Sequence, residues 1–208
     1  MLLQNPMPAI DPAILDLFRS AATAVISDNL SRLPGAVGLR PFHGGGVMVG
    51  RALTVRTVVG DNLLIHKALD LVQPGDVVVV DGGGDESRAL VGEIMTTIAA
   101  SRGAAGMVID GAIRDVAAIA RAGFPCFARS AIHRGPYKNG PGEVNVPVCV
   151  GSMVVNPGDV VVGDEDGVVA FSPKIAVSLA EKVRAQEQRE ADILKSIHDG
   201  TYVGAYAR

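Results

Sequence analysis

Short valine-rich runs, each entered through a turn signal, alternate along the chain with longer segments of helical periodicity. Val77–Val80 follows a Pro-Gly-Asp turn and ends at Asp81, so it predicts a buried strand. Gly82–Gly84 follows at once and predicts a tight turn, although a phosphate-binding loop is an alternative for such a run. A second strand is expected over Ala105–Ile109, with a turn at Asp110-Gly111.

The segment between these two strands has the spacing of an amphipathic helix. We expect this helix over residues 86–101, with Leu90, Ile94 and Ile98 on its apolar face and Gly103 just past its end. A strand, a helix and a second strand in this order are typical of α/β proteins.

The rest of the pattern predicts mixed strands with helices packed around them. The expected elements are a helix over Pro12–Leu33 with a break near Ser27-Asp28, a strand over Val47–Val59, a helix over Asn62–Leu71, strands over Phe124–Ala128, Val144–Val150 and Ser152–Val155, and a hairpin of Val160–Val162 with Val168–Phe171. Ser172 and Pro173 predict the cap and first residue of a polar helix that ends near His198. Together these elements predict a single α/β sandwich domain over residues 1–208.

Length and charge narrow the class of protein. A chain of 208 residues can bury a substantial core as one domain. Its net charge of -3 and charged fraction of 20% predict no broad basic surface, so nucleic acid is not an expected partner. The first ten residues lack the features of a signal peptide and no apolar run reaches membrane-spanning length. We therefore expect a soluble, cytoplasmic protein with no membrane partner.

The two cysteines predict no metal site or disulfide framework. Cys126 and Cys149 are far apart and lack metal-ligand spacing, which fits a reducing compartment. Both are expected to be small buried residues. Hydropathy is positive without tryptophan, so part of the aliphatic surface is expected to cover a subunit interface.

The candidate chemistry lies in a loop between a strand and a helix, where rigid elements present side chains to solvent. This loop carries Arg114 and Asp115. As alternatives, Asp115 would be only the N-cap of the next helix, and Arg114 only a surface ion pair with Asp110 or Asp115. Glu93 follows Gly92, and a merely solvated glutamate would not explain a glycine inside a helix. No role is predicted for the four histidines, which lack metal or triad spacing: His43, His66, His133 and His198.

The chain resembles the RraA-like family in five segments that extend from about Ser27 to Pro173: SDNLSRLPG, PGDVVVVDGGGDESRALVGE, GAAGMVIDGAIRD, GFPCFARS and PGDVVVGDEDGVVAFSP. This family includes the 4-hydroxy-4-methyl-2-oxoglutarate/4-carboxy-4-hydroxy-2-oxoadipate aldolases and was long mislabelled as menaquinone methyltransferases. The sequence has no glycine-rich motif of the methyltransferase kind. Ser130 departs from the glycine usual in the family. The resemblance implies a layered sandwich of the swivelling β/β/α type.

The resemblance also implies a metal site at the Arg-Asp pair. In aldolases of the family the aspartate, here Asp115, binds a divalent metal such as Mg²⁺ or Mn²⁺, a hard cation that prefers oxygen ligands. The arginine, here Arg114, contacts the pyruvate carboxylate and the enolate oxygen, for which a guanidinium fork is suited.

Further residues follow from the same resemblance. Glu93 is expected to hold metal-bound waters, and the backbone around it, at Gly92, Ile94 and Met95, is expected to seat pyruvate. The RExxI pattern of the C-terminal helix implies that Glu190 reaches the site of a neighbouring subunit. The alternative for Glu190 is the solvated face of a charged helix.

The implied activity is a metal-dependent aldolase that cleaves a 4-hydroxy-2-oxo acid to pyruvate, with decarboxylation of oxaloacetate as a side reaction. The family usually forms trimers, sometimes paired into hexamers, with the site between subunits. One alternative is a regulator that inhibits ribonuclease E without catalysis; members of that branch lose the metal aspartate, so Arg114 and Asp115 argue against it. Another is a divergent member that acts on an unknown oxoacid.

Overall fold

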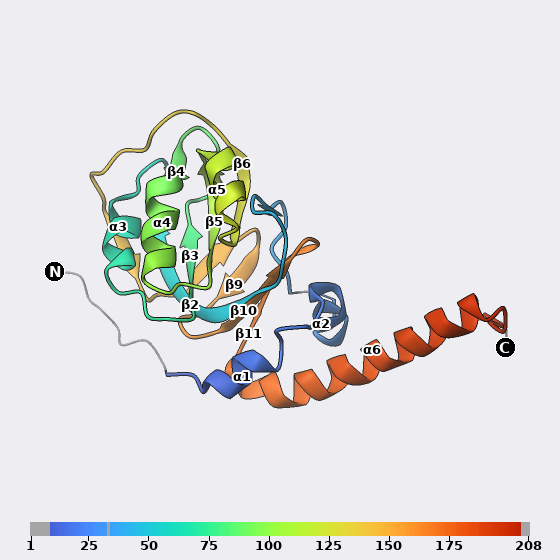
Figure 1. Ribbon diagram of the computed structural model, residues 1–208. Helices are drawn as coiled ribbons and strands as arrows, with labels where there is room; N and C mark the ends of the chain where they lie inside the picture. The colour runs from blue at the N-terminus through green and yellow to red at the C-terminus, as the bar shows by residue number, and fades with distance from the viewer. Residues whose placement is uncertain (1–8, 33, 205–208) are drawn as a thin grey trace.

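The computed structural model describes residues 9–32 and 34–204. Its main feature is a nine-stranded sheet in which the strands follow the order β1-β6-β5-β3-β2-β10-β11, while β4 pairs with β5 and β7 with β2 (Figure 1). β8 and β9 form a separate two-stranded sheet. The strands are β1 (Arg40–Pro41), β2 (Met48–Thr57), β3 (Asp76–Asp81), β4 (Ala89–Val91), β5 (Gly106–Ile113), β6 (Cys126–Ala131), β7 (Gly142–Val144), β8 (Val148–Val150), β9 (Met153–Val155), β10 (Val160–Asp164) and β11 (Gly167–Phe171).

The centre of the large sheet is parallel. β3 pairs in parallel with both β2 and β5, and β5 pairs in parallel with β6. Antiparallel strands complete the sheet on either side, β1 next to β6 and the β10-β11 hairpin next to β2. The four residues Val77–Val80 are wholly buried, because the central strands are covered on both faces.

Alternate side chains of β3 point to opposite faces of the large sheet and pack in two different layers of the hydrophobic core. Val78 and Val80 pack in the cluster beneath α3, α4 and α5, which lie side by side over one face (Figure 1). Val77 and Val79 pack on the opposite face, against the two-stranded sheet of β8 and β9. The predicted layered α/β sandwich is therefore confirmed. The helices are α1 (Pro12–Asp16), α2 (Thr23–Asn29), α3 (Leu63–Leu69), α4 (Glu93–Ser101), α5 (Val116–Ala122), the 3₁₀ helix η1 (Pro173–Ile175) and α6 (Ala176–His198).

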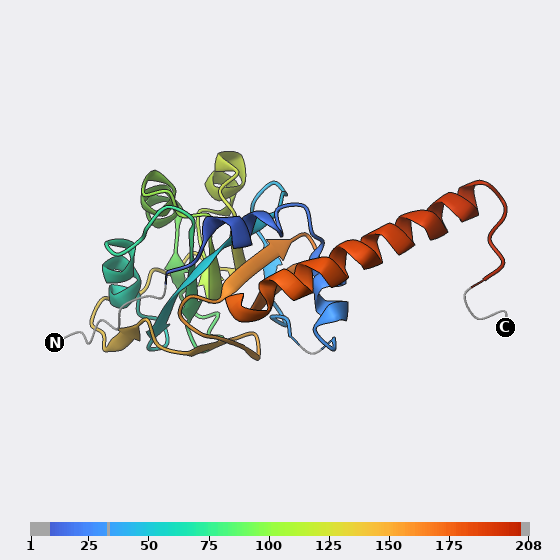
Figure 2. The same ribbon diagram turned by 90° about the horizontal axis from the view of Figure 1, so that it is seen from below.

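The C-terminal helix begins as its sequence predicts. The Ser172 side chain accepts a hydrogen bond from the Lys174 N–H at 3.3 Å, which caps η1 and leads into α6. The first turns of α6, up to Val183, pack against α1, α2, β10 and β11. Beyond this point α6 extends away from the body of the protein (Figure 2). Within the described ranges, no helix is both long enough and apolar enough to cross a membrane.

The helix expected over residues 86–101 is wrong in its first half. Residues 89–91 form β4, which pairs with β5, so Leu90 belongs to a strand and α4 begins only at Glu93. Ile94, expected on the apolar face, is 73% exposed. The turn expected at Asp110-Gly111 is also wrong, because β5 continues through both residues with an irregular register.

The opening helix is two helices with their break at residues 17–22, and Ser27-Asp28 lies inside α2. The start of α2 is set from far along the chain: the Asp164 carboxylate accepts hydrogen bonds from the N–H and hydroxyl of Thr23, at 2.8 and 2.5 Å. The expected end at Leu33 lies outside the described residues.

The strand expected over Val144–Val150 is also divided. Val144 ends β7, which pairs with β2 in the large sheet, whereas Val148–Val150 is β8, which pairs with β9. Between the two strands, Asn145 adopts a positive φ of 57°. Cys126 is buried as expected, which raises the pKa of its thiol to about 12, but Cys149 is exposed.

Candidate functional site

Two strands end side by side at the candidate site. Arg114 follows β5 and Gly92 follows β4, and the N–H of Arg114 donates to the carbonyl of Val91 at 2.9 Å. Arg114 and Asp115 then lead into α5, while Gly92 leads into α4. The sequence expectation of a strand-to-helix loop at this position is confirmed. The carboxyl ends of parallel strands are the usual place for ligands in α/β sheets.

Asp115 stands at the N-cap position of α5 but does not cap this helix with its side chain. Its Oδ2 instead accepts the N–H of Glu93, the first residue of α4, at 3.1 Å. The interpretation of Asp115 as only the cap of its own helix is therefore wrong. Its backbone is left-handed, with φ 58° and ψ 33°, a conformation that costs a non-glycine residue of order 1 kcal/mol.

Arg114 is only loosely paired. Its Nε lies 3.7 Å from Oδ2 of Asp115, and the side chain is 45% exposed. The alternative pairing with Asp110 is wrong, because Asp110 is bound by Arg129 and by the N–H of Gly151. In the described part of the chain, no hydrogen bond engages the two terminal nitrogens of Arg114. The guanidinium fork is therefore available to a carboxylate.

Gly92 is a glycine because the Arg-Asp pair packs directly on it. A Cβ at this position would overlap Oδ2 of Asp115 and would lie 3.0 Å from Cγ of Arg114. Its backbone is extended, with φ -148° and ψ -169°, so the requirement is for space and not for an unusual conformation. The sequence analysis placed Gly92 inside a helix, where glycine lowers helix stability. Gly92 is instead the N-cap residue of α4, so this cost does not arise.

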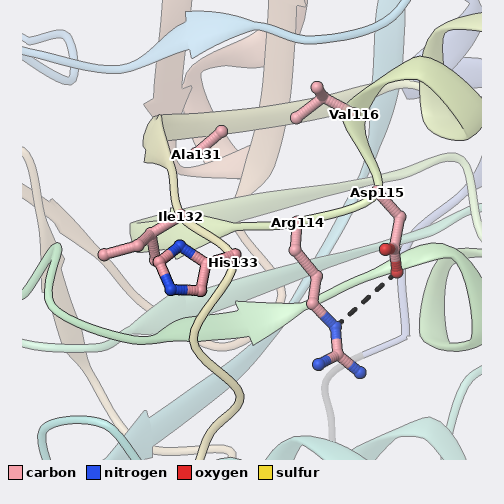
Figure 3. A pocket seen from close by; sticks show the side chains of 6 residues that line it. All are labelled: Arg114, Asp115, Val116, Ala131, Ile132 and His133. Atoms are coloured by element: carbon pink, nitrogen blue, oxygen red, sulfur yellow. Dashed lines mark ion pairs between the residues drawn. The ribbon is translucent and has the colours of Figure 1, made fainter.

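Two cavities share Arg114 and Asp115 as lining residues. The large cavity, of about 400 Å³, is lined by Arg114, Asp115, Val116, Ala131, Ile132 and His133 (Figure 3). The small cavity, of about 140 Å³, is lined by Asn62, His66, Ala89, Leu90, Val91, Gly92, Ile94, Met95, Arg114, Asp115, Pro136 and Lys138. A ligand held by the Arg-Asp pair can therefore extend in either direction.

The structure brings together most of the residues that the sequence singles out. Gly92, Ile94 and Met95 line the small cavity with the Arg-Asp pair. Glu93 is exposed at the start of α4 and touches the site through its N–H. Glu190 is not brought there within one chain: it lies on the extended part of α6, where it accepts a hydrogen bond from Gln186 at 2.8 Å.

Sequence reasoning missed the histidines at this site. His133 lines the large cavity and His66 the small one. For His66 a signal was present, because it follows Asn62, the N-cap residue of α3, by four residues, a spacing that places the two one above the other at the start of the helix. His133 and Lys138 belong to the connection between β6 and β7, whose position could not be inferred from local pattern.

The small cavity has an electrostatic bias. Burial lowers the pKa of His66 below its ordinary value, the charge of Lys138 lowers it further, and Asp70 opposes the shift. The side-chain Nδ2 of Asn62 donates to the Leu90 carbonyl at 2.9 Å, whereas its buried Oδ1 has no partner among the described residues. Lys138 therefore supplies the positive charge on this side of the cavity, while the lowered pKa favours the neutral form of His66.

The Asp115 carboxylate fits a magnesium or manganese ion. Its Oδ2 is held by Glu93, while no donor of the described residues lies within hydrogen-bonding distance of its Oδ1. No group of three potential metal ligands among His, Cys, Asp and Glu occurs within the same residues. Mg²⁺ keeps several waters and often takes only one or two protein carboxylates, so a single accessible aspartate suits it.

The chain is similar to proteins of one family. Residues 23–170 match the family described as RraA-like, Aldolase/RraA. A relative from Halalkalibacterium halodurans, named "Putative 4-hydroxy-4-methyl-2-oxoglutarate aldolase", is 36% identical over 183 residues, which cover 88% of this chain and 87% of that protein.

Solved structures give the same fold. An uncharacterized protein from Pseudomonas syringae pv. tomato superimposes with a TM-score of 0.82 at 29% identity, covering 93% of this chain and 96% of that one. The RNA-processing inhibitor RraA from Thermus thermophilus superimposes with a TM-score of 0.66 at 35% identity, covering 73% and 93%. From the extent of the family match and the identity to its relatives, the chain belongs to the RraA-like family.

Proposed function

We propose that the protein is a divalent-metal-dependent aldolase that cleaves a 4-hydroxy-2-oxo acid, such as 4-hydroxy-4-methyl-2-oxoglutarate, to pyruvate and a second oxoacid. The observation that carries the proposal is the Arg114-Asp115 pair, which lies between two cavities and has both a free guanidinium fork and a free carboxylate oxygen. The name of the relative from Halalkalibacterium halodurans supports the same reaction.

The reaction breaks the bond between C3 and C4 of the substrate. The C4 hydroxyl loses its proton and becomes the carbonyl of the second oxoacid, while the electron pair of the broken bond forms the pyruvate enolate. Protonation of the enolate at C3 then gives pyruvate. Negative charge grows on the enolate oxygen, so the principal task of the protein is to place positive charge beside this atom.

The residues at the end of β5 are suited to this task. Arg114 would bind the carboxylate of the pyruvyl group with its fork and stabilise the enolate oxygen with its charge. The start of α4, at Gly92, Ile94 and Met95, would seat the same carboxylate, because the first N–H groups of a helix attract anions. Mg²⁺ or Mn²⁺ held by Asp115 would supply further positive charge at the enolate oxygen. Glu93 would accept hydrogen bonds from water beside the site.

We also propose that the active form is a homo-oligomer, a trimer or a hexamer, in which Glu190 reaches the site of a neighbouring subunit. The exposed side chains of Ile193, Leu194 and Ile197 on the extended part of α6 support an interface there. The same enolate arises when oxaloacetate loses carbon dioxide, so decarboxylation of oxaloacetate should accompany aldol cleavage.

The alternative is inhibition of a ribonuclease without catalysis, and the structural likeness to the RNA-processing inhibitor from Thermus thermophilus favours it. The available Arg114 and Asp115 favour the aldolase, since an inhibitor that acts by protein contact has no use for a carboxylate held open in a cavity.

The experiment is to measure pyruvate release from a panel of 4-hydroxy-2-oxo acids and from oxaloacetate with added Mg²⁺ or Mn²⁺. We expect release that stops with EDTA and resumes when the metal is restored. Full turnover in a chelated sample would reject the metal mechanism. No release from any acid, together with inhibition of ribonuclease E, would favour the regulator.

A further inference from the structure

The buried side chain of Asn62 leaves one hydrogen-bond acceptor unused in the wall of the small cavity. Asn62 is only 3% exposed and lines this cavity together with the Arg-Asp pair. Its Nδ2 donates to the Leu90 carbonyl at 2.9 Å and to the Met95 sulfur at 3.3 Å, whereas its Oδ1 has no partner among the described residues. Buried polar atoms are nearly always hydrogen-bonded, so an acceptor without a donor beside a cavity indicates a place for a ligand.

The contacts of Asn62 determine which amide atom is left over. The Leu90 carbonyl can only accept a hydrogen bond, so it must face Nδ2 and not Oδ1. The main chain is held as well, because the Asn62 N–H donates to the Tyr137 carbonyl at 3.0 Å. Asn62 is the N-cap residue of α3, yet its side chain makes no cap hydrogen bond. The start of the helix therefore does not explain why this position has an asparagine.

The charged side chains at the same cavity cannot replace this acceptor. Arg114 and Lys138 line the cavity but can only donate. Asp115 can accept, but its carboxylate is the proposed ligand of the metal. Among side-chain atoms in the wall of the small cavity, Oδ1 of Asn62 is the buried acceptor without a partner in the described part of the chain. The cavity thus offers one buried acceptor to a ligand that can donate.

The proposed substrate has one group that can donate a hydrogen bond. At neutral pH the carboxylates of a 4-hydroxy-2-oxo acid are ionised, so their oxygens only accept. The 2-oxo oxygen also only accepts. The C4 hydroxyl is the remaining polar group, and its O–H is a donor. The unused acceptor of the cavity and the single donor of the substrate are therefore complementary.

We propose that Oδ1 of Asn62 accepts a hydrogen bond from the C4 hydroxyl of the substrate and so makes the site selective for hydroxylated oxoacids. This inference rests on the proposed aldolase function. An amide oxygen is too weak a base to take the hydroxyl proton, so Asn62 binds and orients the hydroxyl without removing its proton. An oxoacid that lacks the hydroxyl leaves Oδ1 unpaired, and a site with a buried partner for a hydroxyl discriminates against such an analogue.

The test compares cleavage of 4-hydroxy-4-methyl-2-oxoglutarate with decarboxylation of oxaloacetate, which gives the same enolate from an acid without the C4 hydroxyl. Asn62→Leu keeps the branched shape of the side chain but removes the amide. In this variant, kcat/KM for the hydroxy acid divided by kcat/KM for oxaloacetate should fall about tenfold. Asn62→Ala removes the same oxygen without the bulk of leucine and should show the same fall, so it replaces a leucine variant that does not fold.

Thr57→Val is the matched control. The Thr57 hydroxyl donates to the Asp61 carbonyl at 2.8 Å, so this variant also loses one buried hydrogen bond in the segment that leads into α3. Thr57 lines neither cavity. Its ratio of the two kcat/KM values should stay within about twofold of wild type, because the residue makes no contact with the substrate.

A binding measurement tests the cavity without turnover, and it also provides the comparison if oxaloacetate does not react. With Mg²⁺ present, calorimetry should show that Asn62→Leu binds 2-oxoglutarate, which has no hydroxyl, within about twofold of wild type. Losses of the same factor for the hydroxy acid and for either acid without the hydroxyl would overturn the proposal, because Asn62 would then only shape the cavity. Unchanged kinetics with the hydroxy acid would overturn it by leaving Oδ1 unused. A wild-type protein that releases no pyruvate would instead reject the aldolase function, and this inference with it.

Discussion

Replacing Gly92 by alanine tests whether the Arg-Asp pair is the working part of the site. The extended backbone of Gly92 accepts alanine without strain, so the effect must come from the new methyl group. This group would overlap Oδ2 of Asp115 and lie 3.2 Å from Nε of Arg114. Both side chains must therefore move, and Asp115 must lengthen or lose its hydrogen bond to Glu93.

The magnitude follows from these contacts. Loss of one hydrogen bond costs about 0.5–1.5 kcal/mol and overpacking typically about 1–3 kcal/mol, but the half-exposed Arg114 can swing aside. We expect the free energy of unfolding to fall by about 1–3 kcal/mol, which lowers the Tm by roughly 2–12 °C in a chain of this length. A displacement approaching 1 Å at reacting groups can cost about 10²-fold in rate, so kcat/KM should fall by about that factor.

The assay is pyruvate release together with thermal unfolding of the same samples. Gly123→Ala is the control: Gly123 ends α5 with φ 65°, and an added Cβ would have no neighbour within 4 Å, so this change should lose about 1 kcal/mol through backbone strain alone. It should keep its activity. A folded Gly92→Ala protein with near-normal kcat/KM would refute the assignment of the site to Arg114 and Asp115.

Four further outcomes are expected. Asp115→Asn, which tolerates the same backbone conformation, should fold normally but lose metal-dependent cleavage by about 10²-fold; a near-normal rate would remove Asp115 from the site. Arg114→Lys should lower aldol cleavage and decarboxylation together, since a point charge cannot replace a fork; normal kinetics would contradict this. Inactive Asp115→Ala and Glu190→Ala subunits should regain activity when refolded together, and verified mixed oligomers without recovery would exclude the shared site. Asp61→Asn should lower the free energy of unfolding at neutral pH, because the charged Asp61 carboxylate accepts the N–H groups of Leu63, Asn139 and Gly140. The difference from wild type should disappear as the pH falls below about 3.8 and then through the lowered pKa of Asp61. Urea unfolding across this pH range measures it, and a difference that does not change with pH would show that the charge of Asp61 does not stabilise the fold.

The layered fold could be predicted from the sequence because its strongest signals are local. The run Val77–Val80 forms a central strand, the predicted hairpin forms as β10 and β11, and Ser172 caps the C-terminal helical segment. In each case the residues that determine the structure are neighbours in the chain. The Arg114-Asp115 loop was predictable for the same reason, since strand, loop and helix are consecutive.

The errors arose where distant residues determine the structure. β4 has only three residues and exists because β5 offers it a partner, so its apolar residues were assigned to a helix. The start of α2 is fixed by Asp164, 141 positions away. The small cavity combines the segments around residues 62, 92, 114 and 138, and Lys138 carries no local mark of its position there.

The backbone of Asp115 gives an independent argument for the role of this residue. The left-handed conformation favours glycine by of order 1 kcal/mol, yet the chain has an aspartate there whose side chain leaves its own helix uncapped. Its bond to Glu93 at 3.1 Å offsets part of this cost, but one such bond contributes only about 0.5–1.5 kcal/mol and uses only one oxygen. Departures from local preference are expected at functional sites, where a ligand and not the fold makes use of the side chain. Asp115 lines both cavities beside Arg114, so its unfavourable backbone conformation is what the proposed role of this carboxylate in binding a cation leads us to expect.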